Sequence, residues 1–276
     1  GIAQVDTFHH SGVGEKSSIN QGVPRLKELI SFTQNPKEPQ IIVYLQDKYS
    51  KTYDDADNIR YNIELVQIKD VLISDAIYLE PDNEIDNVLE EDKDVMEIYK
   101  VFQDLDPQAM NIPNNPWLIR LEFDRKQMIE KKLTMGDVKL VLSKNLNNAS
   151  IIFSDDNSGK LIFRLRIDIE SDPLNADNDI KLLNEELENI KNIVIKGIEG
   201  IHKVNKPIVN KKHMIKEGKT YKIEDEYCLD VIGNSLFEIL TKPYVDSTRT
   251  ITNNISEVYE VFGIETTRMM LEHEFH

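Results

Sequence analysis

Two segments near the middle of the chain carry its clearest strand pattern. In Trp117–Phe123, apolar residues at every second position are separated by Arg120 and Glu122, and Leu161–Ile167 repeats the pattern with two arginines. A period of two puts alternate side chains on opposite faces of a strand, so each segment has one apolar face for a core. Both are therefore predicted to be half-buried strands of an antiparallel sheet.

Further elements are predicted between and after these strands. Thr134 can accept a hydrogen bond at the start of a helix, and Ile151–Phe153 can supply one more short strand. The polar run Asp155–Gly159 is typical of a hairpin turn. Apolar residues recur at helical spacing in two places: Met135, Val138, Leu142 and Leu146, and then Ile180, Leu183, Leu187 and Ile190. Helices and antiparallel strands in this order predict an α+β fold.

The flanking regions continue this mixture of helices and strands. Ile41–Leu45 is an unbroken apolar run, which is typical of a strand covered on both faces. A helix is predicted over 58–67 and an extended segment over 71–79. In the final third, an extended stretch over 221–229 precedes helices near 235–240 and 255–271, with a break at Gly263.

Charge and composition exclude several classes of protein. The net charge of −16, from 49 acidic and 33 basic residues, argues against a freestanding nucleic-acid binder, because phosphate contacts need concentrated Lys and Arg. The single cysteine, Cys228, excludes an internal disulfide or a cysteine zinc cluster, and its place on a predicted strand favours a packing role. The sequence contains no apolar run long enough for a membrane span.

Two charged clusters could suggest binding sites. The acidic run 82–94 lacks the glycine and the spacing of an EF-hand, so a solvated acidic helix or loop is predicted there. Arg164 and Arg166 share one face of a strand and could bind phosphate. Solvated arginines paired with acids are the commoner arrangement, and they are the prediction here.

The start of the chain holds a different kind of pattern. If residues 2–10 are helical, Val5 and His9 lie four apart on one face, which puts an aliphatic group one turn below an imidazole. The imidazole titrates near neutrality and can give a proton to a leaving pyrophosphate, while the aliphatic group supports a base. Gly12 and Gly14 begin a polar tip, and Pro24 restarts a helix. Taken alone, the histidine motif is also compatible with ordinary surface or packing residues.

The run Thr7–Val13, followed by Gly22–Leu29, resembles the trigger loop of the largest subunit of multisubunit DNA-dependent RNA polymerases. The resemblance continues in the family's order through 41–45, 116–125, 133–136, 195–199 and 261–265. The stretches 116–125 and 133–136 are most similar to RNA polymerase II. The abundance of Asn, Ile, Lys and Asp suggests an AT-rich source, such as a protist or a large cytoplasmic DNA virus.

The resemblance implies roles for individual residues. His9 would approach the nucleotide triphosphate, and Val5 would lie under the base. Asp6 stands where the family usually has Asn, Arg or Lys near the sugar. Gly12 and Gly14 would let the loop fold. Lys16, Arg25 and Lys27 would lie near DNA or the nucleotide. Arg249 would lie near DNA or support the base, and it is equally compatible with an ordinary surface arginine.

The resemblance also implies an arrangement of segments and partners. Residues 1–60 would form the trigger loop and first cleft segment, 61–192 an inserted jaw domain, and 193–276 a second cleft segment packing back on the first. Mg2+ would be bound by residues outside this chain, so the isolated chain would be an inactive part of a nucleotidyltransferase. Partners would be template and downstream DNA, nucleoside triphosphates, and the second-largest and smaller subunits. The location would be the nucleus, or a viral factory and virion, with no membrane association.

Two alternatives stay open at this point. A noncatalytic interaction protein derived from a polymerase would share every one of these motifs and would bind other subunits. An independent histidine-dependent phosphotransfer enzyme is less favoured, because the sequence has no Walker-type glycine loop and no paired metal carboxylates at a recognisable spacing.

Overall fold

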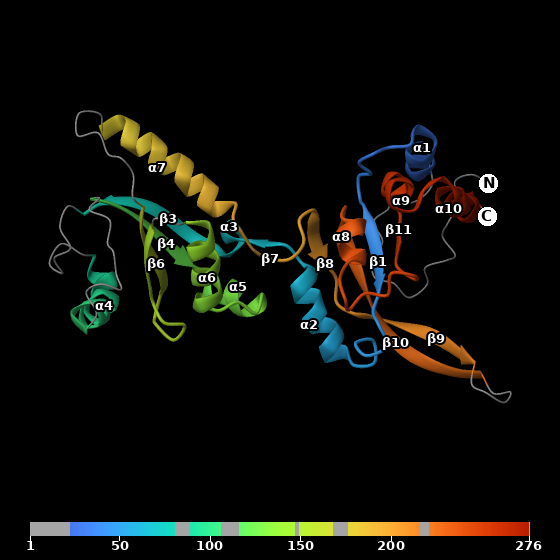
Figure 1. Cartoon of the computed structure of the whole chain (residues 1–276), viewed down its shortest axis with the longest axis horizontal. Coiled ribbons are helices and arrows are strands. Elements are labelled where there is room, and N and C mark those ends of the chain that lie inside the picture. Colours follow the sequence, from blue (N-terminus) through green and yellow to red (C-terminus); the bar gives the residue numbers. More distant parts are fainter. Residues whose placement is uncertain are drawn as a thin grey trace. The chain divides into compact units, whose positions relative to one another are not determined.

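The computed structural model describes residues 23–80, 89–105, 116–146, 149–167, 176–215 and 221–275. The chain divides into two compact units, which Figure 1 shows in sequence colours. The central unit is Val66–Ile195. The terminal unit combines Gly1–Leu65 with Lys196–His276. Both units contain helices and antiparallel strands, so the predicted α+β class is confirmed.

A four-stranded antiparallel sheet forms the middle of the central unit. Its strand order is β3 (Leu72–Leu79), β4 (Trp117–Phe123), β6 (Leu161–Ile167) and β5 (Ala149–Phe153). The turn that follows Phe153 joins β5 to β6 as a hairpin, with the Ser158 amide donating to the Asp155 carbonyl at 3.0 Å. These predicted strands and the hairpin turn are confirmed.

Helices cover one face of this sheet. The odd-numbered residues of β4 and β6 pack with α5 (Arg125–Glu130), α6 (Met135–Asn145) and α7 (Ala176–Lys191) in the main core of the unit. Thr134 caps α6 as predicted: its hydroxyl accepts from the Asp137 amide at 3.2 Å, and the Asp137 carboxylate accepts from the Thr134 amide at 3.0 Å. The predicted apolar stripe of α7 is buried except at Ile180, which is 40% exposed.

The other face of the sheet is covered too, which corrects the prediction of half-buried strands. The segment η4 (Glu90–Asp92) and α4 (Lys93–Leu105) lies on the even-numbered face, where Met96 packs on Ile152 of β5. Arg120 and Arg164 on this face are 6% and 2% exposed. The strand pattern could not reveal this second cover, because an arginine at an alternate position reads as solvent-facing.

The terminal unit is built on a five-stranded antiparallel sheet. Its strand order is β11 (Ile251–Thr252), β1 (Gln40–Tyr44), β10 (Tyr221–Gly233) and β8 (Ile201–Val204), and β9 (Ile208–Ile215) also pairs with β10. β1 therefore lies between two strands from the end of the chain. Ile41 and Val43 are fully buried, whereas Ile42 and Tyr44 are only partly covered, so the prediction of complete cover on both faces holds for one face.

The helix predicted over 58–67 is displaced in the structure. α2 spans Tyr53–Ile63, and Val66–Gln67 forms strand β2 against β7 (Val194–Lys196). Gln67 then begins the short helix α3 (Ile68–Val71) with a capping box to Asp70. Strand pairing and this cap override the helical spacing of the apolar residues, because pairing satisfies the backbone polar groups.

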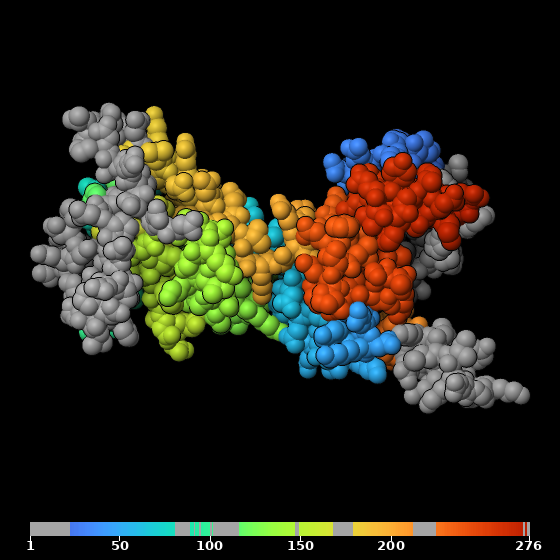
Figure 2. All heavy atoms as spheres, in the orientation of Figure 1, coloured from blue at the N-terminus to red at the C-terminus, as the bar shows by residue number. Residues whose placement is uncertain are grey.

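Four helices of the terminal unit complete its described part: α1 (Val23–Ser31), α8 (Leu236–Leu240), α9 (Ile255–Phe262) and α10 (Ile264–Phe275). Gly263 breaks α9 from α10 as predicted, with a φ of 85° that favours glycine. Figure 2 shows α1, in blue, lying against the red C-terminal helices. The rings of Phe32 and Tyr259 meet edge-on there, with centroids 6.0 Å apart.

Candidate functional site

The predicted catalytic and nucleotide-contacting residues lie outside the described residues. These are His9, Val5, Asp6, Gly12, Gly14 and Lys16. The described structure begins at α1, which directly follows that segment in the sequence. The prediction that Pro24 restarts a helix is confirmed, since Pro24 is the second residue of α1.

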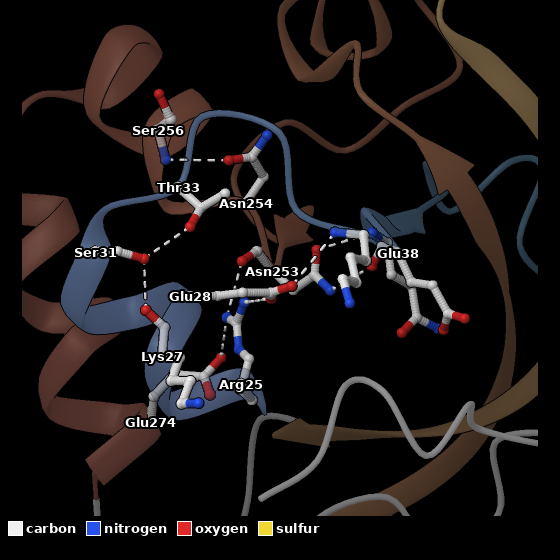
Figure 3. A network of polar contacts seen from close by, with 12 residues as sticks. Arg25, Lys27, Glu28, Ser31, Thr33, Glu38, Asn253, Asn254, Ser256 and Glu274 are labelled. Atoms are coloured by element: carbon white, nitrogen blue, oxygen red, sulfur yellow. Dashed lines mark hydrogen bonds and ion pairs between the residues drawn. The ribbon is translucent and has the colours of Figure 1, made fainter. Parts of the chain in front are cut away.

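Arg25 is the central polar side chain of α1, and it is 8% exposed (Figure 3). One guanidinium nitrogen donates to the Asn253 carbonyl at 2.8 Å and to Oε1 of Glu274 at 3.0 Å. The other terminal nitrogen lies 3.6 Å from Oε2 of Glu28, one turn along α1. The first two acceptors come from the connection before α9 and from α10, so Arg25 joins α1 to the end of the chain.

Asn253 extends this network to the sheet. Its side-chain oxygen accepts from the Gln40 amide at 2.8 Å, and its side-chain nitrogen donates to the Glu38 carbonyl at 3.0 Å (Figure 3). Its backbone amide also donates to the Gln40 carbonyl at 3.0 Å. One asparagine therefore contacts both Arg25 of α1 and the first residue of β1.

Asn254, the next residue, caps α9 and holds the segment that follows α1. Its side-chain oxygen accepts from the Ser256 amide at 3.1 Å, and its nitrogen donates to the Gln34 carbonyl at 3.5 Å. Asn254 is 2% exposed. These contacts of Asn253 and Asn254 run mainly from side chain to backbone, and they fix the course of residues 31–40.

The other predicted DNA-proximal residues lie in different surroundings. Lys27 is exposed on α1. Arg249 lies in the turn that follows Asp246, forms a two-point ion pair with the buried carboxylate of Glu226, and stacks on Tyr44 with 4.4 Å from the guanidinium carbon to the ring centroid. Hydrogen bonding to Glu226 raises the pKa of Arg249 against the opposing effect of burial.

Arg25 and Lys27 lie on the same helix, α1, but Arg25 is buried and Lys27 is exposed, and Arg249 lies elsewhere. Arg25 contacts the residue that pairs with the Gln40 end of β1, whereas Arg249 lies at the Tyr44 end. These ends are about 13 Å apart at 3.3 Å per residue. The DNA-proximal role of these residues stays a prediction, with Arg25 and Arg249 already engaged by acceptors within the chain.

Cys228 is the single thiol, and it is 6% exposed on β10. Burial raises the pKa of Cys228 to about 11, with a further contribution from the negative charges of Glu226 and Asp230. A thiol with this pKa is protonated at neutral pH and is a poor nucleophile. The predicted packing role is therefore confirmed.

A buried ion network in the central unit was not predicted. Arg120 and Arg164 face each other in the register of β4 and β6, and Asp92 lies between them. Its carboxylate lies 2.5 Å from Arg164 and 3.2 Å from Arg120, and it is fully buried. Glu80 completes the network at 2.5 Å from Arg164 and 3.3 Å from Arg166.

This network corrects two predictions. The arginines of β6 are paired with acids, as predicted, but they are buried rather than solvated. Asp92, at the end of the acidic run, is buried as well, so it is not part of a solvated acidic surface. Two like charges directly opposite on neighbouring strands repel, and the fully buried Asp92 offsets this repulsion.

The pKa values of two arginines in the network shift in opposite directions. Burial lowers the pKa of Arg120, but the hydrogen bonds and charges of Asp92 and Glu122 together raise it above its ordinary value. At Arg166 burial dominates and the pKa is lowered. The cross-strand arginines could have been found from the sequence by aligning the two strand patterns, whereas the acids that pair with them come from segments whose position the sequence did not fix.

No group of three or more His, Cys, Asp or Glu side chains among the described residues could hold a metal ion. No helix in the described part of the chain is long and apolar enough to cross a membrane.

A comparison with protein families gives a direct match for one part of the chain. Residues 66–199 match RNA polymerase Rpb1, domain 7. The matched segment starts with the central unit and ends shortly after it, covering just under half of the 276 residues. It supports a member of the RNA polymerase largest-subunit family, and with it a part in transcription as a component of a DNA-directed RNA polymerase.

Proposed function

We propose that this chain is part of the catalytic largest subunit of a DNA-directed RNA polymerase of the RNA polymerase II type. In this proposal residues 1–22 and α1 act as the trigger loop that closes over the incoming nucleotide, and the central unit is the jaw beside downstream DNA. The observation that carries the proposal is the match of 66–199 to Rpb1, domain 7. The Thr7–Val13 motif and α1 precede that segment in the order that the resemblance requires.

His9 has the main chemical role in this proposal. Its imidazole would contact the triphosphate of a bound nucleotide, stabilise the charge that develops on the leaving pyrophosphate, and supply a proton or a hydrogen bond. Val5, one helical turn away, would support the base, and Asp6 would lie near the sugar. Gly12 and Gly14 would allow the loop to change conformation between open and closed states.

The metal ions of the reaction would be held elsewhere in the enzyme. In nucleotidyl transfer two Mg2+ ions activate the attacking hydroxyl and stabilise the leaving group. Their ligands would come from residues outside this chain. Residues 1–22 then contribute by positioning the substrate and by charge stabilisation, so the isolated chain would not synthesise RNA.

The partners follow from the same proposal. Lys16 and Lys27 would face DNA on a limited inner surface, while the rest of the acidic chain faces solvent or other subunits. The second-largest and smaller subunits would contact the remaining faces, and the template and downstream duplex would pass along the cleft. The enzyme would work in the nucleus, or in a viral factory and virion if the source is a virus.

Replacing His9 by Ala in the assembled polymerase tests this proposal. Single-nucleotide addition at saturating substrate should slow by about 100-fold or more, because one positioned acid or hydrogen-bond donor typically supplies that much. The apparent affinity for the nucleotide should change far less. His202→Ala is the matched control, since His202 is an exposed histidine on β8. Unchanged elongation by His9→Ala rejects the proposal, and recovery of the chain only with inhibited polymerase would favour the interaction protein.

A further inference from the structure

We propose that the terminal sheet binds the phosphate backbone of duplex DNA along one of its borders, through a lysine edge that consists of Lys203, Lys206 and Lys211. The proposed function puts DNA beside Lys16 and Lys27, and this inference goes beyond it to a second surface. It needs neither residues 1–22 nor catalysis, so it stands or fails separately.

The sequence of β8 and β9 has a charge opposite to that of the whole chain. Between Gly200 and Glu217 it holds five lysines and no aspartate or glutamate, although acidic residues outnumber basic ones by 49 to 33 overall. Phosphate binding needs cations concentrated in one place, whatever the net charge of the protein. This stretch therefore meets locally the condition that the chain as a whole does not meet.

The fold places this stretch along one open border of the sheet. β8 and β9 both pair with β10 on the side away from β1. Among the described residues neither pairs with a further strand, and only residues 205–207 separate them (Figure 1). The three lysines thus follow one another along the border. At 3.3 Å per residue they span about 26 Å, the length of about eight base pairs.

The lysine edge is available to an external anion. Lys203, Lys206 and Lys211 are all exposed, and none of them forms an ion pair among the described residues. Two arginines of the same unit differ, because Arg25 is paired with Glu274 and Arg249 with Glu226. The cations that are free to bind phosphate are therefore on the lysine edge rather than at these arginines.

The lysines approach the border from both faces of the sheet. Lys203 lies opposite Ile232 of β10 and Lys211 lies opposite Asp225, and positions an odd number apart in a strand point to opposite faces. A flexible four-carbon side chain can reach a partner along the border from either face. Asp225 is an exposed acid, so it weakens the positive field at the Lys211 end.

The chemistry of this border fits a duplex better than a single strand. Proteins that bind single strands stack the bases on aromatic side chains, and β8 and β9 contain no Phe, Tyr or Trp. Ammonium groups bind phosphate as point charges and do not read the bases. Binding should therefore be independent of base sequence and should depend strongly on salt.

The test is the fluorescence anisotropy of a short labelled duplex titrated with the full chain. Three phosphate contacts predict an affinity that falls about 40-fold between about 50 and 200 mM salt. Replacing all three lysines, by Lys203→Gln, Lys206→Gln and Lys211→Gln in one variant, should weaken binding at least about 10-fold at the lower salt and remove most of the salt dependence. Asp225→Asn should strengthen binding about 2- to 5-fold, because it removes an opposing exposed charge.

The matched control removes the same charge elsewhere. Lys126→Gln, Lys144→Gln and Lys181→Gln, combined in one chain, replace one exposed lysine on each of α5, α6 and α7. This variant should keep nearly the affinity of the original chain. Equal losses in the two triple variants would show that only the overall charge matters, and they would overturn the inference.

The remaining outcomes also decide. No measurable binding by the original chain at the lower salt overturns the inference. Lysines also protect open strand borders from pairing with other chains. If the triple variant of the lysine edge self-associates but keeps its affinity for DNA, this protection is their role and the inference fails. Tighter binding of a single strand or of polyglutamate than of the duplex would overturn the choice of partner.

A single substitution keeps the test open if the triple variant does not fold. Lys206 lies in the connection between β8 and β9, outside both ladders, so Lys206→Gln removes a charge without touching a strand. It should lower the slope of log affinity against log salt by about one. An unchanged slope overturns the inference. None of these measurements involves His9, so the proposed function is tested independently.

Discussion

The central and terminal units both bury arginines, but they pair them in different ways. In the central unit Arg120, Arg164 and Arg166 share the carboxylates of Asp92 and Glu80, and all five side chains are nearly or fully buried. In the terminal unit Arg25 bonds one carbonyl and one partly exposed carboxylate. The central network thus lies inside a folded layer, whereas the Arg25 contacts join separate segments at the edge of a core.

The two arrangements should have different roles: the buried network stabilises the central unit, whereas the contacts of Arg25 position α1. Removing one member of a buried network leaves other charges without partners in a low-dielectric interior, which strongly destabilises the fold. Removing one contact of Arg25 leaves the sheet of the terminal unit intact and frees mainly a short helix. We therefore expect substitutions in the buried network to destabilise the central unit as a whole. Substitutions at Arg25 or its acceptors should mainly affect the position of α1.

Asp92→Ala should have the largest effect on stability. It leaves Arg164 and Arg120 without the carboxylate between them, and breaking a buried pair in this way costs about 3–5 kcal/mol. Trp117 is the only tryptophan and lies on β4, so its fluorescence during urea unfolding of the full chain follows the central unit. Glu188→Ala is the control because it removes an exposed ion pair with Lys191. A shift of under about 1 kcal/mol for Asp92→Ala would show that this network is not stabilising in the way that buried pairs are.

Glu274→Ala should have a smaller and local effect. It removes one of the contacts of Arg25 at a site where the Glu274 side chain is 20% exposed, so about 1 kcal/mol is expected. Hydrogen exchange of the α1 amides should become faster, because local opening of this helix becomes easier. The Trp117 unfolding midpoint should stay unchanged, since Trp117 belongs to the other unit.

Glu272→Ala is the matched control for this experiment. Glu272 lies on the same helix but pairs with exposed Arg268. Equal exchange of α1 in Glu274→Ala and Glu272→Ala would mean that the Arg25 contacts do not hold the helix. A lower urea midpoint of Trp117 fluorescence in Glu274→Ala would mean that the contacts of Arg25 also stabilise the central unit, and the two units could then not be compared as independent.

Local sequence signals predicted much of the fold. The helix cap at Thr134, the hairpin turn after Phe153 and the break at Gly263 depend on residues close together in the sequence, and all three are present. The strands β4 and β6 were also found from their period of two. These features follow from backbone geometry and propensity, which a short window of sequence contains.

Long-range features could not be predicted in this way. Whether Arg164 faces solvent or Asp92 depends on a segment that is 72 residues away, and the contact of Arg25 with Glu274 spans 249 residues. The end of the helix predicted over 58–67 was wrong because Val66–Gln67 pairs as β2 with β7, a strand at the far end of the central unit. For the candidate site, the sequence named Arg25 as a functional residue, but its acceptors became visible only in the structure.

Glu257 gives the smallest expected effect and tests the terminal unit by pH. Burial, with a further contribution from the charge of Glu260, raises the pKa of Glu257 above its ordinary value of 4.5. A carboxyl group whose pKa is raised on folding stabilises the fold while it is protonated, and this contribution is lost as the pH rises through the folded pKa. Glu257→Gln should therefore melt slightly higher than the original chain at pH 7, and the difference should vanish below about pH 4.5.

Circular dichroism melts of both chains across this pH range measure the difference, and Glu265→Gln is the control because Glu265 is an exposed carboxylate on α10. The opposing contribution is the bond from the Leu236 amide to Oε1 of Glu257 at 3.5 Å, which the ionised carboxylate strengthens. Its other oxygen is buried without a hydrogen-bond partner among the described residues, so burial should win. A lower melting temperature for Glu257→Gln at pH 7 would contradict this expectation. It would show that the hydrogen bond from the Leu236 amide at the start of α8 stabilises the ionised carboxylate by more than burial destabilises it.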